Sequence, residues 1–266
     1  MNRKLERNQL KKNFLQEIII RLDFQGVLQP EMEKVLLIAK PYLKEKSFKR
    51  YNEIVNNQTI VEGTSPKDFS SPITYTFMDD NYGFALALST TSIVMSIQSE
   101  VYSPFENYSE IFSYIASLYN EEIDFFTVKR FGLRKINYCF VKRVSDINKY
   151  FDSKYFDLEE PISGFDIETI NRTSSLSYGK KNLNLRYAVE KGNLDKEPFY
   201  KVTLDSDIYS VDKATIHSII ENKDEMASIN EMLFTIYCGA LTDQMAELLT
   251  SENDLPEGLA GVENNE

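Results

Sequence analysis

The sequence predicts an α+β protein in which curved antiparallel β-sheets pack against amphipathic helices. Segments rich in β-branched and aromatic residues, bounded by turn signals, outnumber the segments with apolar residues at helical spacing. The helical patterns follow groups of strands and do not alternate with single strands, which favours antiparallel sheets with segregated helices. Tyrosine and phenylalanine are abundant (16 and 17 residues), whereas glycine and proline are scarce (10 and 8), so we expect ordered, aromatic-rich sheets.

The chain is expected to form two sub-domains that share one core. A polar, acidic stretch separates two groups of strands, and the two ends carry opposite charges: five bases and one acid at 1–12, and five acids and no base at 251–266. We therefore expect a basic arm (1–12), an N-terminal α+β half (13–143), a connection (144–165), a C-terminal β-meander with a long helix (166–250) and an acidic disordered tail (251–266).

In the N-terminal half, strands are interleaved with two helical patterns. Residues 14–24 alternate around an isoleucine-rich run and predict the first strand. Apolar residues at helical spacing predict a helix over 30–43, and the polar residues 44–72 are expected to be mainly a loop. Residues 73–98 predict a β-meander, because their first turn contains Asp, Asn and Gly. A second helix is expected over 107–119.

The segment Phe125–Arg143 predicts one long, central strand. It is rich in aromatic and β-branched residues and contains no proline. It also carries six basic side chains and no acid, in a chain whose net charge is −11. Three more strands are expected between 167 and 209, and a final helix over 223–250.

Composition excludes several classes of protein. A net charge of −11 repels a phosphate backbone, so general affinity for nucleic acid is not expected. No apolar run approaches the roughly 18 residues that span a bilayer, and no secretory signal is recognisable, so we expect a cytoplasmic protein without membrane contact. The two cysteines, Cys139 and Cys238, are predicted to be free thiols.

No common catalytic or cofactor motif is present, and no cofactor is expected. The chain contains no P-loop, GxGxxG, GxSxG or HExxH pattern. His217 is the only histidine, which excludes histidine-rich metal sites and disfavours Ser-His-Asp or Cys-His catalysis.

Arg134 is the first candidate for a site. Counted along an alternating strand, it shares a face with Val128, Ile136 and other apolar residues, where a guanidinium needs a partner. Glu17 in the first strand is the partner we favour, and the pair would fix the strand register. The alternative is an Arg134 that binds a ligand carboxylate or phosphate through two parallel hydrogen bonds.

Asp205 and Asp207 are a second candidate. They are two residues apart on a predicted strand, so both carboxylates point to one face together with Lys201. With a third acid such as Asp166 or Glu168, they could hold Mg²⁺ or Mn²⁺. A solvated strand face with Lys201 as counter-charge gives the same pattern.

The bases and aromatic residues of Phe125–Arg143 also suggest a stacking platform for single-stranded nucleic acid. The alternative interpretation is that these bases neutralise acidic neighbours within an acidic protein. We favour the second interpretation.

Four short motifs occur in an order that resembles a known family. They are Leu15-Gln-Glu17, Gly132-Leu133-Arg134 with Asn137, Leu204-Asp205-Ser206-Asp207, and Leu241-Thr242-Asp243. Together they resemble a prokaryotic family of unknown function that is described as sporadically distributed. The chain departs from that pattern at Lys135, where the family has tyrosine. The resemblance implies a fold and patchy inheritance, and it implies no reaction.

From these observations we expect a non-catalytic protein-interaction or regulatory module of a sporadically inherited operon of mobile-element or defence type, with a protein partner. The alternative is an enzyme or nucleic-acid-acting protein that uses the region of Arg134, Asn137, Asp205 and Asp207. The residues do not predict the oligomeric state.

Overall fold

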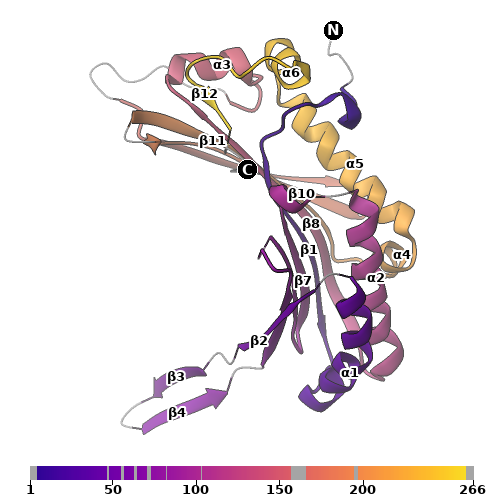
Figure 1. The fold of residues 1–266 in the computed structure, drawn as a ribbon. Helices are drawn as coiled ribbons and strands as arrows, with labels where there is room; N and C mark the ends of the chain where they lie inside the picture. The colour runs from indigo at the N-terminus through magenta and orange to yellow at the C-terminus, as the bar shows by residue number, and fades with distance from the viewer. Residues whose placement is uncertain are drawn as a thin grey trace. The chain divides into compact units, whose positions relative to one another are not determined.

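The computed structural model describes residues 5–46, 48–54, 57–62, 65–70, 73–81, 83–102, 104–156, 166–194 and 197–261. It confirms the α+β class (Figure 1). The main sheet is antiparallel, open and ten-stranded, with the order β2-β5-β6-β7-β1-β8-β11-β10-β9, and β12 pairs with β8. The strands β3 and β4 form a separate hairpin.

The sheet contains β1 (Leu15–Gln25), β2 (Arg50–Ile54), β5 (Thr74–Met78), β6 (Phe84–Leu88), β7 (Ser92–Gln98), β8 (Thr127–Val141), β9 (Thr169–Tyr178), β10 (Lys181–Leu194), β11 (Glu197–Ser210) and β12 (Leu259–Ala260). The separate hairpin is β3 (Asn57–Glu62) with β4 (Ser65–Ser70). The helices are η1 (Arg7–Gln9), α1 (Gln29–Glu45), η2 (Ser99–Val101), α2 (Phe105–Glu122), η3 (Val144–Asp146), α3 (Ile147–Tyr150), α4 (Lys213–Glu221), α5 (Lys223–Gly239) and α6 (Asp243–Thr250).

The chain forms two compact units that interleave along the sequence. Unit 1 comprises residues 1–17, 134–208 and 229–266, and unit 2 comprises residues 18–133 and 209–228. Whereas the sequence predicted a division near 144–165, the strands β1, β8 and β11 each contribute residues to both units.

In unit 2, one face of the strands β1, β5, β6 and β7 is buried and the other is mostly partly exposed. The predicted meander is present as β5, β6 and β7, and every second residue of each strand is buried. The buried residues of β1 are those that alternation placed on one face, namely Ile18, Ile20, Leu22 and Phe24. The helices α1 and α2 lie alongside these strands (Figure 1), and their apolar stripes are buried.

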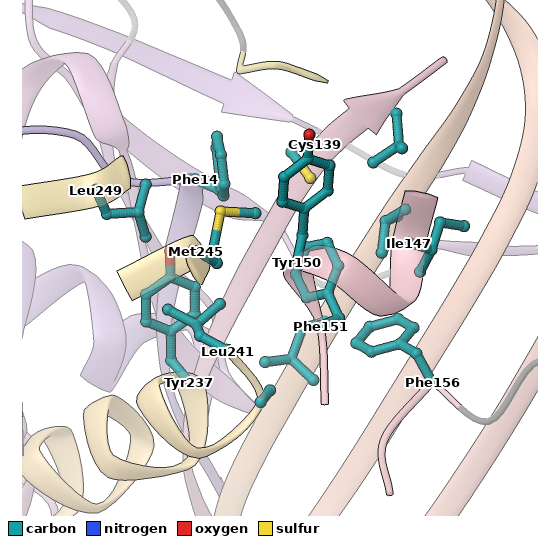
Figure 2. Packing of buried hydrophobic residues seen from close by; sticks show 14 of the residues in the cluster. Phe14, Cys139, Ile147, Tyr150, Phe151, Phe156, Tyr237, Leu241, Met245 and Leu249 are labelled. Carbon is teal, nitrogen blue, oxygen red and sulfur yellow. The ribbon is translucent and has the colours of Figure 1, made fainter. Parts of the chain in front are cut away.

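Unit 1 has its own hydrophobic core, part of which is shown in Figure 2, and residues of β8, β10, β11, β12, α3, α5 and α6 contribute to it. Cys139 from β8 packs with Tyr237 from α5 and Met245 from α6. The predicted connection also contributes, because Ile147 of α3 and Phe151 are buried in this cluster. Residues 144–156 are therefore part of the core of unit 1, while the rest of the predicted connection lies outside the described residues.

The predicted long helix over 223–250 is two helices. The helix α5 ends at Gly239, and α6 begins after Thr242. Thr242 is the N-cap of α6: its Oγ1 accepts a hydrogen bond from the Met245 N–H (3.2 Å) and donates one to the Lys149 carbonyl (2.6 Å). The Thr242-Asp243 motif, which the sequence placed inside one long helix, is thus the start of a separate helix.

Removing the Thr242 hydroxyl should weaken the start of α6. We expect Thr242→Ala to lower the free energy of unfolding by about 1 kcal/mol, because an N-terminal amide of α6 and the Lys149 carbonyl each lose a partner. Chemical denaturation measures this change. Thr242→Ser keeps the hydroxyl and should restore most of the loss, and a loss as large in Thr242→Ser would contradict the cap.

The predicted disorder of the acidic tail is wrong for residues 251–261. Leu259 is buried, β12 pairs with Val141 and Phe140 of β8, and the Lys142 N–H donates to the Gly258 carbonyl at 2.8 Å. The basic arm is likewise packed: the N–H groups of Lys11 and Lys12 donate to the Leu249 carbonyl at 2.8 and 3.1 Å. These charged segments also contain apolar residues that are buried, such as Leu5 and Leu259, and the count of charges did not take them into account.

Candidate functional site

The strand β8 presents two different faces. Between Phe131 and Val141, the odd-numbered residues are buried, whereas Arg134 and the other even-numbered residues from 134 to 140 are only partly buried. The alternation changes phase between Val128 and Phe131, so Val128 and Arg134 do not share a face, as the sequence had suggested. A residue outside the regular alternation has this effect, because it shifts all later side chains to the opposite face.

Arg134 forms a bidentate ion pair with Asp205 of β11. Arg134 Nε lies 2.7 Å from Asp205 Oδ1, and Arg134 Nη2 lies 2.5 Å from Asp205 Oδ2. The Asp205 side chain is 8% exposed and the Arg134 side chain is 42% exposed. The guanidinium therefore reaches solvent while its partner is almost fully covered.

The partner of Arg134 in this bidentate pair is thus Asp205, where the sequence favoured Glu17. Glu17 nevertheless contributes through its charge. The hydrogen bonds that Arg134 donates to Asp205 raise the pKa of Arg134, burial opposes this rise, and the charges of Asp205, Asp207 and Glu17 add to it. The structure therefore brings four of the predicted residues, Glu17, Arg134, Asp205 and Asp207, into one electrostatic cluster in unit 1.

Asn137 does not belong to this cluster. It lies on the buried, odd-numbered face of β8, and its Nδ2 donates to the Leu204 carbonyl at 3.5 Å, which is a long contact. Its position supports a role in connecting neighbouring strands.

Aromatic side chains flank the cluster on the partly exposed face of β8. Tyr138 and Phe140 contact edge to face, with ring centroids 5.7 Å apart. Lys201 Nζ lies 4.0 Å from the centroid of the Tyr138 ring, which is a cation–π geometry. Together with Arg134, these residues form a mixed cationic and aromatic surface, called the β8 surface below (Arg134, Ile136, Tyr138, Phe140 and Lys201).

Both carboxylate oxygens of Asp205 accept hydrogen bonds from Arg134. They are therefore already occupied at the position where the sequence suggested a metal site with Asp207. Within the described ranges, no group of three or more His, Cys, Asp or Glu side chains is arranged to hold a metal ion. The charge of the Arg134 guanidinium is balanced by Asp205, and its exposed part can still donate hydrogen bonds to a ligand or a partner.

In unit 2, Arg130 of the long strand is also matched within the chain. Arg130 Nη1 lies 3.8 Å from Asp23 Oδ2, and its guanidinium lies 4.8 Å from the centroid of the Tyr209 ring. Asp23 additionally accepts a hydrogen bond from Arg21 Nε at 2.7 Å. For Arg130, these contacts agree with the interpretation that the bases of this strand neutralise acidic neighbours.

Sequence reasoning missed the most unusual charged residue, Lys135. It lies on the buried face of β8 and is only 6% exposed. Burial lowers the pKa of Lys135 from 10.5 to about 7, and the nearby positive charge of Arg7 lowers it further, against smaller opposing effects of Glu231 and Cys238. The alternation of the strand, counted from Phe131, contained the signal that would have found it.

The surroundings of Lys135 come from the N-terminal arm and from α5. Arg7 Nη2 donates to the Asn230 carbonyl at 2.7 Å, its Nε contacts Glu231 Oε2 at 3.2 Å, and its guanidinium lies 4.4 Å from the Phe234 ring centroid. Arg7 thus fastens the arm to α5 in the neighbourhood of the buried amine.

The cysteines are free, as predicted. Burial raises the pKa of the Cys139 thiol strongly and raises that of Cys238 to about 11. Thiols with raised pKa values are poor nucleophiles, because the thiolate is the reactive form.

No known protein-family model matches the chain, and no curated protein matches it. Among the described residues, the helices are all too short or too polar to cross a membrane.

Proposed function

We propose that the protein is a non-catalytic interaction module that binds a protein partner through the β8 surface. The observation that carries this proposal is that Arg134 is paired within the chain and is still partly exposed to solvent. Its charge is satisfied by Asp205, yet its side chain remains 42% exposed beside partly exposed aromatic rings. Such a surface suits recognition, because aromatic and arginine side chains supply much of the binding energy at protein interfaces.

The chemistry of the surface defines the kind of partner. Tyr138 and Phe140 offer flat apolar area, while Lys201 and Arg134 offer donors at its border. A partner with an aliphatic or aromatic anchor, flanked by carbonyl or carboxylate groups, matches this arrangement. The resemblance to a sporadically distributed family supports a role within a sporadically inherited operon.

Site-specific photo-crosslinking in the native host tests the proposal. A benzophenone amino acid in place of Tyr138 should trap one protein that also copurifies stoichiometrically with the unmodified chain. The matched control is the same substitution at Phe125, an aromatic residue that is 78% exposed in unit 2. It should not trap that protein.

Variants of the surface sharpen the test. Lys201→Glu, which removes the cation over Tyr138, should reduce copurification of the partner while the thermal unfolding temperature stays close to that of the native chain. Trapping of DNA or RNA at position 138, with retention that falls steeply with salt, would favour the nucleic-acid alternative. Equal trapping of the same protein at positions 138 and 125 would contradict the proposed surface.

A further inference from the structure

The strand β9 (Thr169–Tyr178) is a terminal strand of the sheet. It pairs with β10 over ten residues, from Tyr178↔Lys181 to Thr169↔Glu190. Among the strands that the structure describes, none pairs with its other edge. Free edges of this kind are templates for pairing with a further strand, and proteins usually block them with short length, charges or proline.

The strand β9 carries few of the protections expected at an edge. At the other end of the strand order, β2 is five residues long and carries Arg50 and Glu53. By contrast, β9 is ten residues long, contains no proline, and has Arg172 as its single charge. Because the whole chain has a net charge of −11, a surface strand without any acid adds no negative charge of its own to the repulsion between two copies.

The backbone groups of β9 alternate between the two edges. The Lys191 N–H donates to the Glu168 carbonyl at 2.9 Å, in continuation of the β9–β10 register, so even-numbered residues direct their backbone groups toward β10. The odd-numbered residues from 169 to 177 therefore direct their N–H and C=O groups toward the open edge.

The end of β9 is apolar and exposed. Leu176 is 55% exposed and Tyr178 is 77% exposed, and both lie on the face that also carries Ile170, which packs against the core of unit 1. Exposed large apolar side chains next to a free strand edge indicate a contact surface.

We propose that β9 of one copy pairs antiparallel with β9 of a second copy, about a two-fold axis at Ser174. In this register, Thr173 faces Ser175 of the second copy, and both are odd-numbered residues whose backbone groups point outward. Arg172 faces Leu176 of the second copy, whose apolar surface its methylene groups can cover. No like charges face each other along the paired strands, and the polar pairs are of the Ser and Thr type that stabilises sheets.

The charges beyond the ends of β9 specify a second copy as the partner. The same register places Glu168 opposite Lys180 of the second copy, and the two-fold axis repeats this pair. Glu168 contacts Lys191 within its own chain, yet its side chain remains 71% exposed and can approach a second cation. Gly179, with a φ of 59°, and Lys180 form the tight turn that places this cation directly after the strand.

Sedimentation equilibrium on the full chain tests the proposal. We expect a dimer at micromolar concentration. Ser175→Pro removes an N–H at the open edge and leaves the backbone hydrogen bonds to β10 intact, although it also deletes the hydrogen bond from Ser175 Oγ to Asn184 Oδ1 (2.9 Å). It should weaken dimerisation about a hundredfold while circular dichroism remains unchanged. A monomeric native chain, or a dimer that is indifferent to Ser175→Pro, would overturn the proposal. A monomer that instead captures a strand of another protein would overturn it as well.

A charge exchange tests the register, even if the proline variant does not fold. Glu168→Lys and Lys180→Glu should each weaken the dimer about tenfold, because each introduces two like-charge pairs. Mixing the two single variants should restore association, since both pairs in the mixed dimer are then opposite in charge. Failure of the mixture to associate better than either variant alone contradicts the pairing. This outcome is independent of partner binding at the β8 surface.

Discussion

Replacing Lys135 with methionine should raise the free energy of unfolding at pH 7 by about 3 to 4 kcal/mol. The amine is 6% exposed, and burial lowers its pKa from 10.5 to about 7. Each unit of such a shift corresponds to about 1.4 kcal/mol, and the difference between the folded and unfolded chains is a cost to the native state. Methionine keeps a flexible side chain of similar length and removes the ionisable group.

The pH dependence of stability should change in the same variant. Between about pH 7 and the unfolded pKa near 10.4, the unfolded chain binds a proton at Lys135 that the folded chain lacks. The contribution of Lys135 to stability therefore rises with pH across this window and is constant below it. Subtracting the stability curve of Lys135→Met from that of the native chain should reveal this rise.

The control for this prediction is Lys129→Met. Lys129 lies on the same strand but is exposed, so the same change should alter stability by less than about 0.5 kcal/mol. Chemical denaturation at several pH values measures both variants. Destabilisation by Lys135→Met, or an identical pH profile in the native chain and the variant, would contradict a lowered pKa of Lys135 in the folded chain.

A double-mutant cycle should reveal strong coupling between Arg134 and Asp205. We expect Arg134→Met to cost about 2 kcal/mol of stability, because it leaves a covered carboxylate without its bidentate partner. This value is below that of a fully buried pair, since Arg134 is partly solvated. The double variant with Asp205→Asn should lose at least about 1 kcal/mol less than the sum of the single losses.

The matched control is the pair of Arg186 and Glu190. Their side chains are 37% and 42% exposed, and the ion pair is 3.5 Å long. The same cycle, with Arg186→Met and Glu190→Gln, should give a coupling below about 0.5 kcal/mol. Additive losses at Arg134 and Asp205 would rule out the ion pair as a structural element, and the case for a ligand-binding arginine would then be the stronger one.

Local patterns predicted the elements that bury one face. One face of each of these elements is apolar and is buried in the fold. This holds for the isoleucine-rich strand β1, for the meander of β5 to β7 and for the apolar stripes of α1 and α2. The structure of the charged ends was harder to predict. Their composition indicated disorder, although single apolar residues such as Leu259 are buried.

The sequence predicted which residues belong to the candidate site, but it did not predict that Arg134 forms its bidentate pair with Asp205. The strand β8 lies between β1 and β11 in the sheet, so acids on either neighbour can approach Arg134. Local sequence contains no signal for which neighbour supplies the closer carboxylate. Lys135 was missed for a related reason, since the change of phase near Phe131 exchanges the two faces of β8.

The composition of unit 1 constrains when it can form during synthesis. Its core needs residues near the start of the chain together with residues beyond 229, and Lys12 Nζ bonds to the Ser251 carbonyl at 2.5 Å. A ribosome therefore releases the last of these segments only after all of unit 2 has been translated. Until then, the apolar side chains of the strands of this unit lack the contacts that α5 and α6 supply, so the core of unit 1 forms late.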